Sequence, residues 1–287
     1  MSTAAEGTKP YYYVPQPSHW PILGSFALLL MGSGAAFWFN FYAAGPWMVA
    51  TGFCILLVML FGWFGTVIGE SEHRLYNKKV DISFRWGMSW FIFSEVMFFA
   101  AFFGALFYIR NLSVPDLGSM SSKLLWPNYA AQWPTNGPYE TGQFSPMHAM
   151  GIPLLNTIIL LTSGVTLTIA HHGLKAGHRG VLKLWLFLTI VLGFTFVGFQ
   201  AFEYFHAYTE MNLKLSTGVY GSTFFMLTGF HGLHVTIGAT MLTVMLARVF
   251  RGHFDAEHHF AFEASAWYWH FVDVVWLLLF VLVYWLV

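Results

Sequence analysis

Between Lys9 and Glu70 the chain has no charged residue at all. A helix needs about 20 apolar residues to cross a bilayer, so this stretch is longer than one crossing and has to be divided. The segment 40–46 (NFYAAGP) is the only turn-like cluster inside it. We therefore predict two membrane-spanning helices, at 21–40 and 47–68, that form a hairpin.

Five further charge-poor runs have the length of membrane helices. Each is continuously apolar, whereas the strands of an outer-membrane barrel alternate over about ten residues. Only 9% of all residues are charged, against about 25% in soluble domains. The net charge is zero, so the chain has no net basic character that would recruit nucleic acid. We predict an all-α polytopic membrane protein with seven transmembrane helices. The five runs lie at 86–109, 152–171, 184–206, 218–247 and 262–286.

The lysine and arginine residues predict the orientation, because short cytoplasmic loops retain positive charge during insertion. Ten of the thirteen fall on one side of the membrane if the N-terminus is inside, and an odd number of spans then places the C-terminus outside. The inner ones are Lys9, Arg74, Lys78, Lys79, Arg85, Lys175, Arg179, Lys183, Arg248 and Arg251, and the outer ones are Arg110, Lys123 and Lys214.

We predict a single membrane domain over residues 1–287. The connection at 111–151 contains five prolines, and it is too short for a domain and too long for a turn. We expect it to form a long loop on the outer side. The first residues lack the basic start and short apolar core of a cleaved signal, and no long polar tail follows the last run. We therefore expect the membrane domain to carry the function.

Two carboxylates lie near the middle of apolar runs, whereas Glu203 lies near the end of its run. Glu95 lies about ten residues into the third run, near the bilayer midplane at 1.5 Å rise per residue, where an ionised carboxylate costs several kcal/mol. It is expected to be protonated or hydrogen-bonded, and proton handling and a structural bond between helices both remain open. For Asp273 we favour a structural bond, because indole, phenol and imidazole donors crowd the same segment.

His231 and His234 are three residues apart, on one face of the sixth predicted helix. A catalytic or redox metal would need further ligands at the same depth, and a thiolate cluster is excluded because Cys54 is the only cysteine. We instead expect His234 to hydrogen-bond Glu95, provided that the third and sixth helices are neighbours. We predict no metal site. A haem would need two axial histidines on facing helices, and the spacing of the histidines in the sequence does not determine which of them would pair.

The sequence lacks the motifs of several other kinds of catalytic or binding site. Ser163-Gly164 lacks the first glycine of a nucleophile turn, and glycine loops for nucleotides and helical zinc motifs do not occur. Two alternatives remain from the residues alone. One is a stand-alone proton or solute transporter with Glu95 and Asp273 as a relay, although paired broken helices are missing. The other is a haem-bearing membrane enzyme that acts alone.

Several strings carry a resemblance to a known family. Together with SHWPILGS near the N-terminus and VIGES at 67–71, they resemble subunit III of the haem-copper cytochrome c oxidases, in the full-length seven-helix bacterial type, over nearly the whole chain. The strings are FIFSEVMFFAAFF (91–103), PLLNTIILLTSGVTLTIAHH (153–172), QAFEYFHA (200–207), VYGSTFFMLTGFHGLHVTIGA (219–239) and HHFAFEASAWYWHFVDVVW (258–276).

The resemblance implies an accessory subunit without a redox centre of its own. Its seven helices would form a two-helix and a five-helix part, with a V-shaped groove that holds structural phospholipids against the catalytic subunit. Subunit I would be the direct partner, with subunit II in the same complex, cytochrome c as electron donor, and haem and copper in the partner subunits. The implied role is to stabilise subunit I and to support proton uptake during O2 reduction to water.

The resemblance also implies roles for single residues. Glu95 matches the family's buried carboxylate, and His234 matches its histidine partner. Trp63, Glu70 and Arg248 match positions that contact lipid head groups, which suits an interfacial indole and a guanidinium that binds phosphate bidentately. The remaining intramembrane polar residues, expected to serve in packing, are His231, Glu203 and Asp273.

The chain departs from mitochondrial members of this family in two segments. Within 111–151 the string GPYETGQFSPMHAM looks bacterial, and at 74–79 charged residues replace a histidine-rich stretch. The resemblance to bacterial members implies a multi-pass protein of the bacterial inner membrane with its N-terminus in the cytoplasm.

Overall fold

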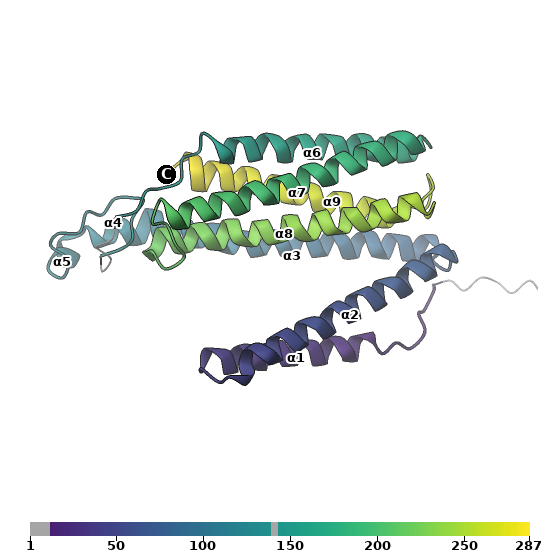
Figure 1. Ribbon diagram of the computed structural model, residues 1–287, viewed down its shortest axis with the longest axis horizontal. Coiled ribbons are helices and arrows are strands. Elements are labelled where there is room, and N and C mark those ends of the chain that lie inside the picture. Colours follow the sequence, from purple (N-terminus) through teal and green to yellow (C-terminus); the bar gives the residue numbers. More distant parts are fainter. Residues whose placement is uncertain (1–11, 139–142) are drawn as a thin grey trace, which may run out of the picture. The chain divides into compact units, whose positions relative to one another are not determined.

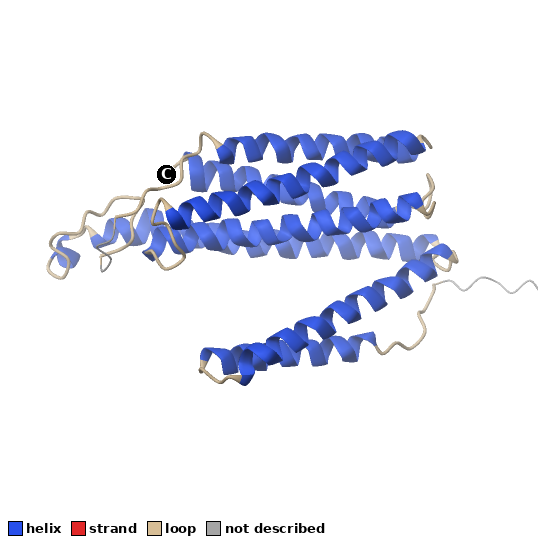
Figure 2. Cartoon of the chain, viewed as in Figure 1, coloured by secondary structure: helices blue, strands red, loops and turns tan. Residues whose placement is uncertain are grey.

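A computed structural model describes residues 12–138 and 143–287, so that Lys9 lies outside the described residues. These residues form helices joined by loops, without a strand among them (Figure 2). Seven helices are long and apolar enough to cross a membrane, and the prediction of an all-α chain with seven such helices is confirmed. They are α1 (Trp20–Phe39), α2 (Ala44–Glu72), α3 (Lys78–Tyr108), α6 (Ile152–Lys175), α7 (Arg179–Thr209), α8 (Gly218–Phe250) and α9 (Phe260–Leu279) (Figure 1).

Several helices extend beyond the charge-poor runs of the sequence. Helix α3 begins at Lys78 rather than near residue 86, and α7 begins at Arg179 rather than near residue 184. Backbone hydrogen bonds within a helix form whatever charge its side chains carry, and long basic side chains reach from a helix end toward the head groups. Charge therefore marks where a helix leaves the apolar layer and not where it ends.

The end of α3 passes without a break into the predicted loop at 111–151. A π-helical turn, η1 (Ile109–Ser113), leads into the short helix α4 (Val114–Leu117), and α5 (Met120–Lys123) follows. The Val114 N–H donates to the Ile109 carbonyl, five residues earlier. A proline inside a regular helix clashes with the carbonyl four residues before it. The wider π turn gives Pro115 room, and the helical path continues past 111.

The chain divides into two compact units, the first ending at Phe84 and the second beginning at Arg85. The first unit contains the hairpin of α1 and α2, which approach closely at glycines. A Cβ atom added at Gly52 would lie 2.8 Å from the Ala27 carbonyl oxygen, and one added at Gly34 would lie 2.8 Å from the Val49 nitrogen. Small residues permit this backbone approach, which drives helix association in lipid.

The second unit packs α6, α7 and α8 around α9, which has two tryptophans buried in the core. Trp269 and Trp276 are fully buried, and their indole N–H groups donate to Ser163 Oγ and Thr157 Oγ1 of α6, each over 2.9 Å. A buried indole N–H needs such an acceptor. The turn η2 (Phe280–Trp285) continues α9 toward the C-terminus.

Helix α3 attaches to this bundle through long aromatic side chains. The rings of Phe98 and Phe102 lie 5.0 and 5.3 Å from Phe230 of α8, and Phe91 stacks on Tyr268 of α9 at 6.2 Å. Aromatic pairs at such separations are favourable beyond their burial. They hold the middle of α3 beside α8 and α9.

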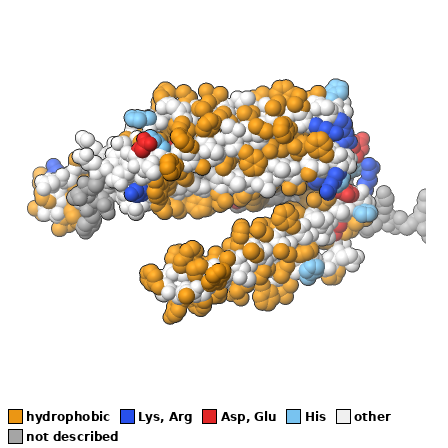
Figure 3. All heavy atoms as spheres, viewed as in Figure 1, with side chains coloured by type: hydrophobic (Ala, Val, Ile, Leu, Met, Phe, Trp, Pro, Cys, Tyr) orange, Lys and Arg blue, Asp and Glu red, His pale blue; other side chains and the backbone are white. Residues whose placement is uncertain are grey.

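Charged side chains gather at the end of the second unit where α6 ends and α7 begins, and the visible sides of its helices are largely apolar (Figure 3). This distribution suits helices that lie in lipid and end at the head groups. The basic residues near this end include Lys175, Arg179, Lys183, Arg248 and Arg251.

Candidate functional site

Glu95 of α3 and His234 of α8 form a hydrogen bond inside the second unit. His234 Nε2 lies 2.9 Å from Glu95 Oε2, and His234 Nδ1 lies 2.6 Å from the Phe230 carbonyl oxygen. A carbonyl only accepts, so Nδ1 must carry a proton. A second proton then lies between Nε2 and the carboxyl group, either on the acid as a neutral pair or on the ring as an ion pair. The geometry can therefore hold one exchangeable proton.

The surroundings of this pair are aromatic. The His234 ring lies 5.0 Å from the Phe99 ring, 6.0 Å from Phe98 and 6.4 Å from Tyr268. The His234 side chain is 11% exposed and the Glu95 side chain 22%. Burying a charge in such a site is costly unless it is paired. Glu95 therefore depends on His234 for its polar contact among the described residues.

Glu203 lies at the far end of α7, in a separate polar contact. It is 1% exposed, and the Tyr284 hydroxyl donates to its Oε1 over 2.7 Å. Its Oε2 has no hydrogen-bond partner among the described residues, and neither does the amide of Gln200 one turn earlier. The bond from Tyr284 ties α7 to the end of the last helix.

Asp273 is buried between α9 and α6. Its Oδ2 lies 3.5 Å from His270 Nδ1, too long for a strong hydrogen bond. The indole donors expected from the sequence do not reach it in this structure, because Trp269 and Trp276 donate to α6. The interaction with His270 is thus the one polar contact of this carboxyl group among the described residues.

His231 serves as a bridge between two helices. It is fully buried, its Nε2 lies 3.2 Å from the Val272 carbonyl oxygen of α9, and its ring packs against Trp276 and Phe196. The N–H at Nε2 donates to that carbonyl. Within the described ranges, no group of three or more His, Cys, Asp or Glu side chains is placed to hold a metal ion.

The predicted lipid contacts of the first unit have different environments. The Trp63 side chain is exposed. Glu70 accepts hydrogen bonds from the hydroxyls of Tyr13 over 3.1 Å and Tyr76 over 2.6 Å. Burial, together with the bond to the Glu70 carboxylate, raises the pKa of the Tyr76 phenol above its ordinary value. Glu70 thus organises two tyrosines next to the end of α2.

Arg248, the third predicted lipid contact, lies at the end of α8. It is only 6% exposed, and its guanidinium lies 4.4 Å from the Phe254 ring centroid in the loop after α8. This loop packs against the side chain. The sequence could not indicate this burial, because Phe254 reaches Arg248 only through the path of the loop.

One connection was missed from the sequence. Arg85 Nη1 lies 2.8 Å from Glu263 Oε1, and the Arg85 guanidinium lies 5.4 Å from the Phe260 ring. This ion pair joins the first half of α3 to the beginning of α9. The available signal was a charge of opposite sign near the first residue of each run.

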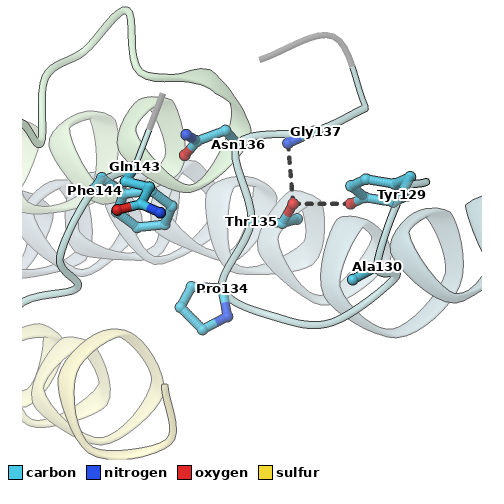
Figure 4. Close-up of a pocket in the computed structure, with 8 residues that line it drawn as sticks. All are labelled: Tyr129, Ala130, Pro134, Thr135, Asn136, Gly137, Gln143 and Phe144. Carbon is cyan, nitrogen blue, oxygen red and sulfur yellow. Dashed lines mark hydrogen bonds between the residues drawn. The ribbon is translucent and has the colours of Figure 1, made fainter. Parts of the chain in front are cut away.

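A pocket of about 370 Å³ lies in the connection between α5 and α6. In Figure 4 the Thr135 hydroxyl bonds the Tyr129 hydroxyl, over 2.9 Å, and accepts from the Gly137 N–H, over 3.1 Å. Its described lining contains no carboxylate, imidazole or thiol, so these residues offer no metal site. The lining residues are Tyr129, Ala130, Pro134, Thr135, Asn136, Gly137, Gln143 and Phe144.

The chain is similar to known proteins over nearly its full length. A family model described as "Cytochrome c oxidase subunit III" matches residues 9–287. The "Cytochrome c oxidase subunit 3" of Carassius auratus is 44% identical over 275 residues, which cover 96% of this chain and 96% of the relative. Proteins of the same name from Oryctolagus cuniculus and Mus musculus are 44% and 43% identical, with the same coverage.

Proposed function

Because the chain belongs to the cytochrome c oxidase subunit III family, we propose that it is the accessory, non-catalytic subunit III of a proton-pumping oxidase. It binds subunit I directly and lies in one complex with subunit II. Electrons enter from cytochrome c, and O2 is reduced to water at haem and copper that the partner subunits hold. This chain stabilises subunit I and supports proton uptake.

The single observation that carries this proposal is the pair of Glu95 and His234. The deepest carboxylate of α3 is paired with an imidazole of α8 over 2.9 Å, and the two are packed among aromatic rings. This arrangement suits proton retention and helix bracing, since it satisfies the polar groups within the protein. We assign the pair to proton support of the complex.

Lipid binding is proposed for the exposed aromatic surface of α2. An indole at the level of the head groups is favourable, and apolar rings beside it suit acyl chains. Trp63 lies in the same half of α2 as Glu70, about two helical turns before it. The exposed aromatic side chains of this helix include Trp47, Phe53, Phe61, Trp63 and Phe64.

We place the chain in the bacterial inner membrane with its N-terminus in the cytoplasm and its C-terminus outside. The basic cluster at the end of α6 and the start of α7 (Figure 3) supports this orientation, as do Arg74, Lys78 and Lys79 before the apolar part of α3. The string at 137–150 and the charged segment at 74–79 support a bacterial origin.

Purification of the complex through a tag on this chain, in mild detergent, tests the proposal. We expect a haem spectrum, two larger partner subunits and bound phospholipid in one preparation. A colourless chain that also fails to crosslink to oxidase subunits in intact membranes would contradict it. Proton or solute transport by the purified chain alone in proteoliposomes would then favour the transporter with intramembrane carboxylates.

A further inference from the structure

Three polar side chains meet at the surface of the second unit, at the depth of the membrane interior. His270 Nδ1 lies 3.5 Å from Asp273 Oδ2, and His270 Nε2 lies 3.4 Å from Thr168 Oγ1 of α6. The His270 side chain is 44% exposed, whereas that of Asp273 is 9% exposed. Asp273 falls midway along the membrane-spanning segment Phe260–Trp285. The imidazole therefore points out of the bundle where a lipid bilayer is apolar.

The surface around His270 is apolar and continuous along both helices. On α9 the exposed residues recur every three or four positions, and on α6 a similar series runs past Thr168, which is the spacing of one helical face. Because His270 contacts Thr168, the two faces adjoin. The exposed apolar residues are Leu161 and Val165 of α6 and Val274, Leu277, Leu278 and Val281 of α9.

The hydrogen bonds among His270, Asp273 and Thr168, which together are called the triad below, are weak. Distances of 3.4 and 3.5 Å are at the limit of hydrogen bonding, Thr168 donates its proton to the Gly164 carbonyl, and Asp273 Oδ1 is buried without a partner among the described residues. Acyl chains offer neither donors nor acceptors. If His270 Nδ1–H donates to Asp273, the lone pair on Nε2 receives no proton from Thr168, and lipid tails cannot supply one.

We infer that the α6–α9 face around His270 docks a transmembrane helix of another oxidase subunit, which presents a hydrogen-bonding side chain to His270 at mid-membrane depth. Polar side chains in lipid associate helices in this way. When Asp273 accepts from Nδ1–H, Nε2 is an acceptor, so the partner side chain is a donor such as a hydroxyl or an amide. The identity of the partner as an oxidase subunit rests on the proposed function.

Gly164 supports this reading of the triad. A Cβ atom added there would lie 2.5 Å from Asp273 Oδ2 and 3.5 Å from His270 Nδ1. The carboxyl group therefore rests on the backbone of α6 and sits beneath the imidazole. Gly164→Ala would displace both groups while leaving the exposed apolar residues unchanged.

Photocrosslinking in the intact complex tests the inference. A photoreactive side chain is placed at Val274, which is 58% exposed beside His270, and the matched control is placed at Val191 of α7, which is 43% exposed. We expect Val274 to give a specific protein adduct that maps to a transmembrane helix of a partner subunit. Adducts with lipid alone, or equal protein adducts from both positions, would overturn the inference.

A second measurement tests the role of His270 itself. His270→Leu should weaken retention of the partner subunit during detergent purification by about three- to tenfold, His270→Gln should restore most of it, and Val191→Leu should leave it unchanged. If all three variants retain the partner subunit equally and haem still copurifies with the chain, the inference is overturned. Loss of haem and partners already in the unsubstituted chain, together with no crosslink to oxidase subunits in intact membranes, would overturn the proposed function as well.

Discussion

Glu95 and His234 lie 139 residues apart in the chain, and one hydrogen bond of 2.9 Å joins them across α3 and α8. The Phe230 carbonyl fixes a proton on His234 Nδ1, so the bond between Nε2 and the carboxyl group contains one further proton. Aromatic rings surround the pair. The structure therefore combines a link between two helices with a site for a single proton.

We expect Glu95→Gln to leave assembly intact and to impair proton uptake of the complex. The amide can still donate to His234 Nε2, but it cannot release a proton. Proton uptake, phospholipid content and the number of turnovers before inactivation are measured in the purified oxidase. Asn111→Gln, at an exposed amide of η1, serves as a control. If all three quantities match those of the unsubstituted oxidase, the pair has only a structural role.

We expect Trp276→Phe to lower the free energy of unfolding by about 2–4 kcal/mol. The substitution removes a buried hydrogen bond to Thr157, worth about 1 kcal/mol, and leaves a cavity that adds about 1–3 kcal/mol. Denaturant unfolding in detergent micelles measures the change. Trp63→Phe, at an exposed indole, should change stability by less than about 0.5 kcal/mol, and an equal loss at both positions would contradict the role of burial.

We expect Gly52→Ala to destabilise the α1–α2 hairpin by about 1–3 kcal/mol. The new Cβ atom would lie 2.8 Å from the Ala27 carbonyl oxygen, and this backbone contact can be relieved only by a shift of one helix. Gly65→Ala in the same helix meets nothing within 4 Å and should be neutral. Thermal unfolding of both variants, followed by proteolysis within α1, distinguishes local loss of the hairpin from a global effect.

We expect Asp255, in the loop between α8 and α9, to contribute a pH-dependent part of the stability. Burial raises the pKa of its carboxyl group, but hydrogen bonds from the backbone N–H groups of His258 and Glu257 outweigh burial, so the pKa lies below its ordinary value. A carboxyl group whose pKa is lower in the folded than in the unfolded state stabilises the fold when it is ionised. This contribution is complete above the pKa of the unfolded state, near pH 4, and is lost as the pH falls through the pKa of the folded state.

The midpoint of thermal unfolding between pH 3 and pH 7 tests this contribution. Asp255→Asn should lower the midpoint at pH 7 and flatten its decline toward acid. Glu257→Gln, whose substitution keeps the backbone donor, should keep the slope of the unsubstituted chain. A slope that is unchanged in Asp255→Asn would show that other carboxylates cause the acid loss.

The positions of helix ends show where prediction from the sequence stops. The run that starts near residue 86 indicated a membrane span, yet α3 begins at Lys78 and its helical path continues to Leu117. Hydropathy reports which residues prefer lipid. Helix ends depend on backbone hydrogen bonds, such as the π turn that admits Pro115, and these leave little trace in residue polarity.

The amino-acid sequence by itself determined the all-helical class and the seven apolar helices, because hydropathy over about 20 residues is a local property. It also contained the strings that place the chain in its family. The bond between Glu95 and His234 was expected from the sequence on the condition that α3 and α8 are neighbours. Only the tertiary structure decided that they are, and which other polar groups meet. Trp276 reaches Thr157, Arg248 lies under Phe254, and His270 faces outward beside Asp273. These contacts join residues on different elements, and their geometry follows from the packing of whole helices, which no local pattern encodes.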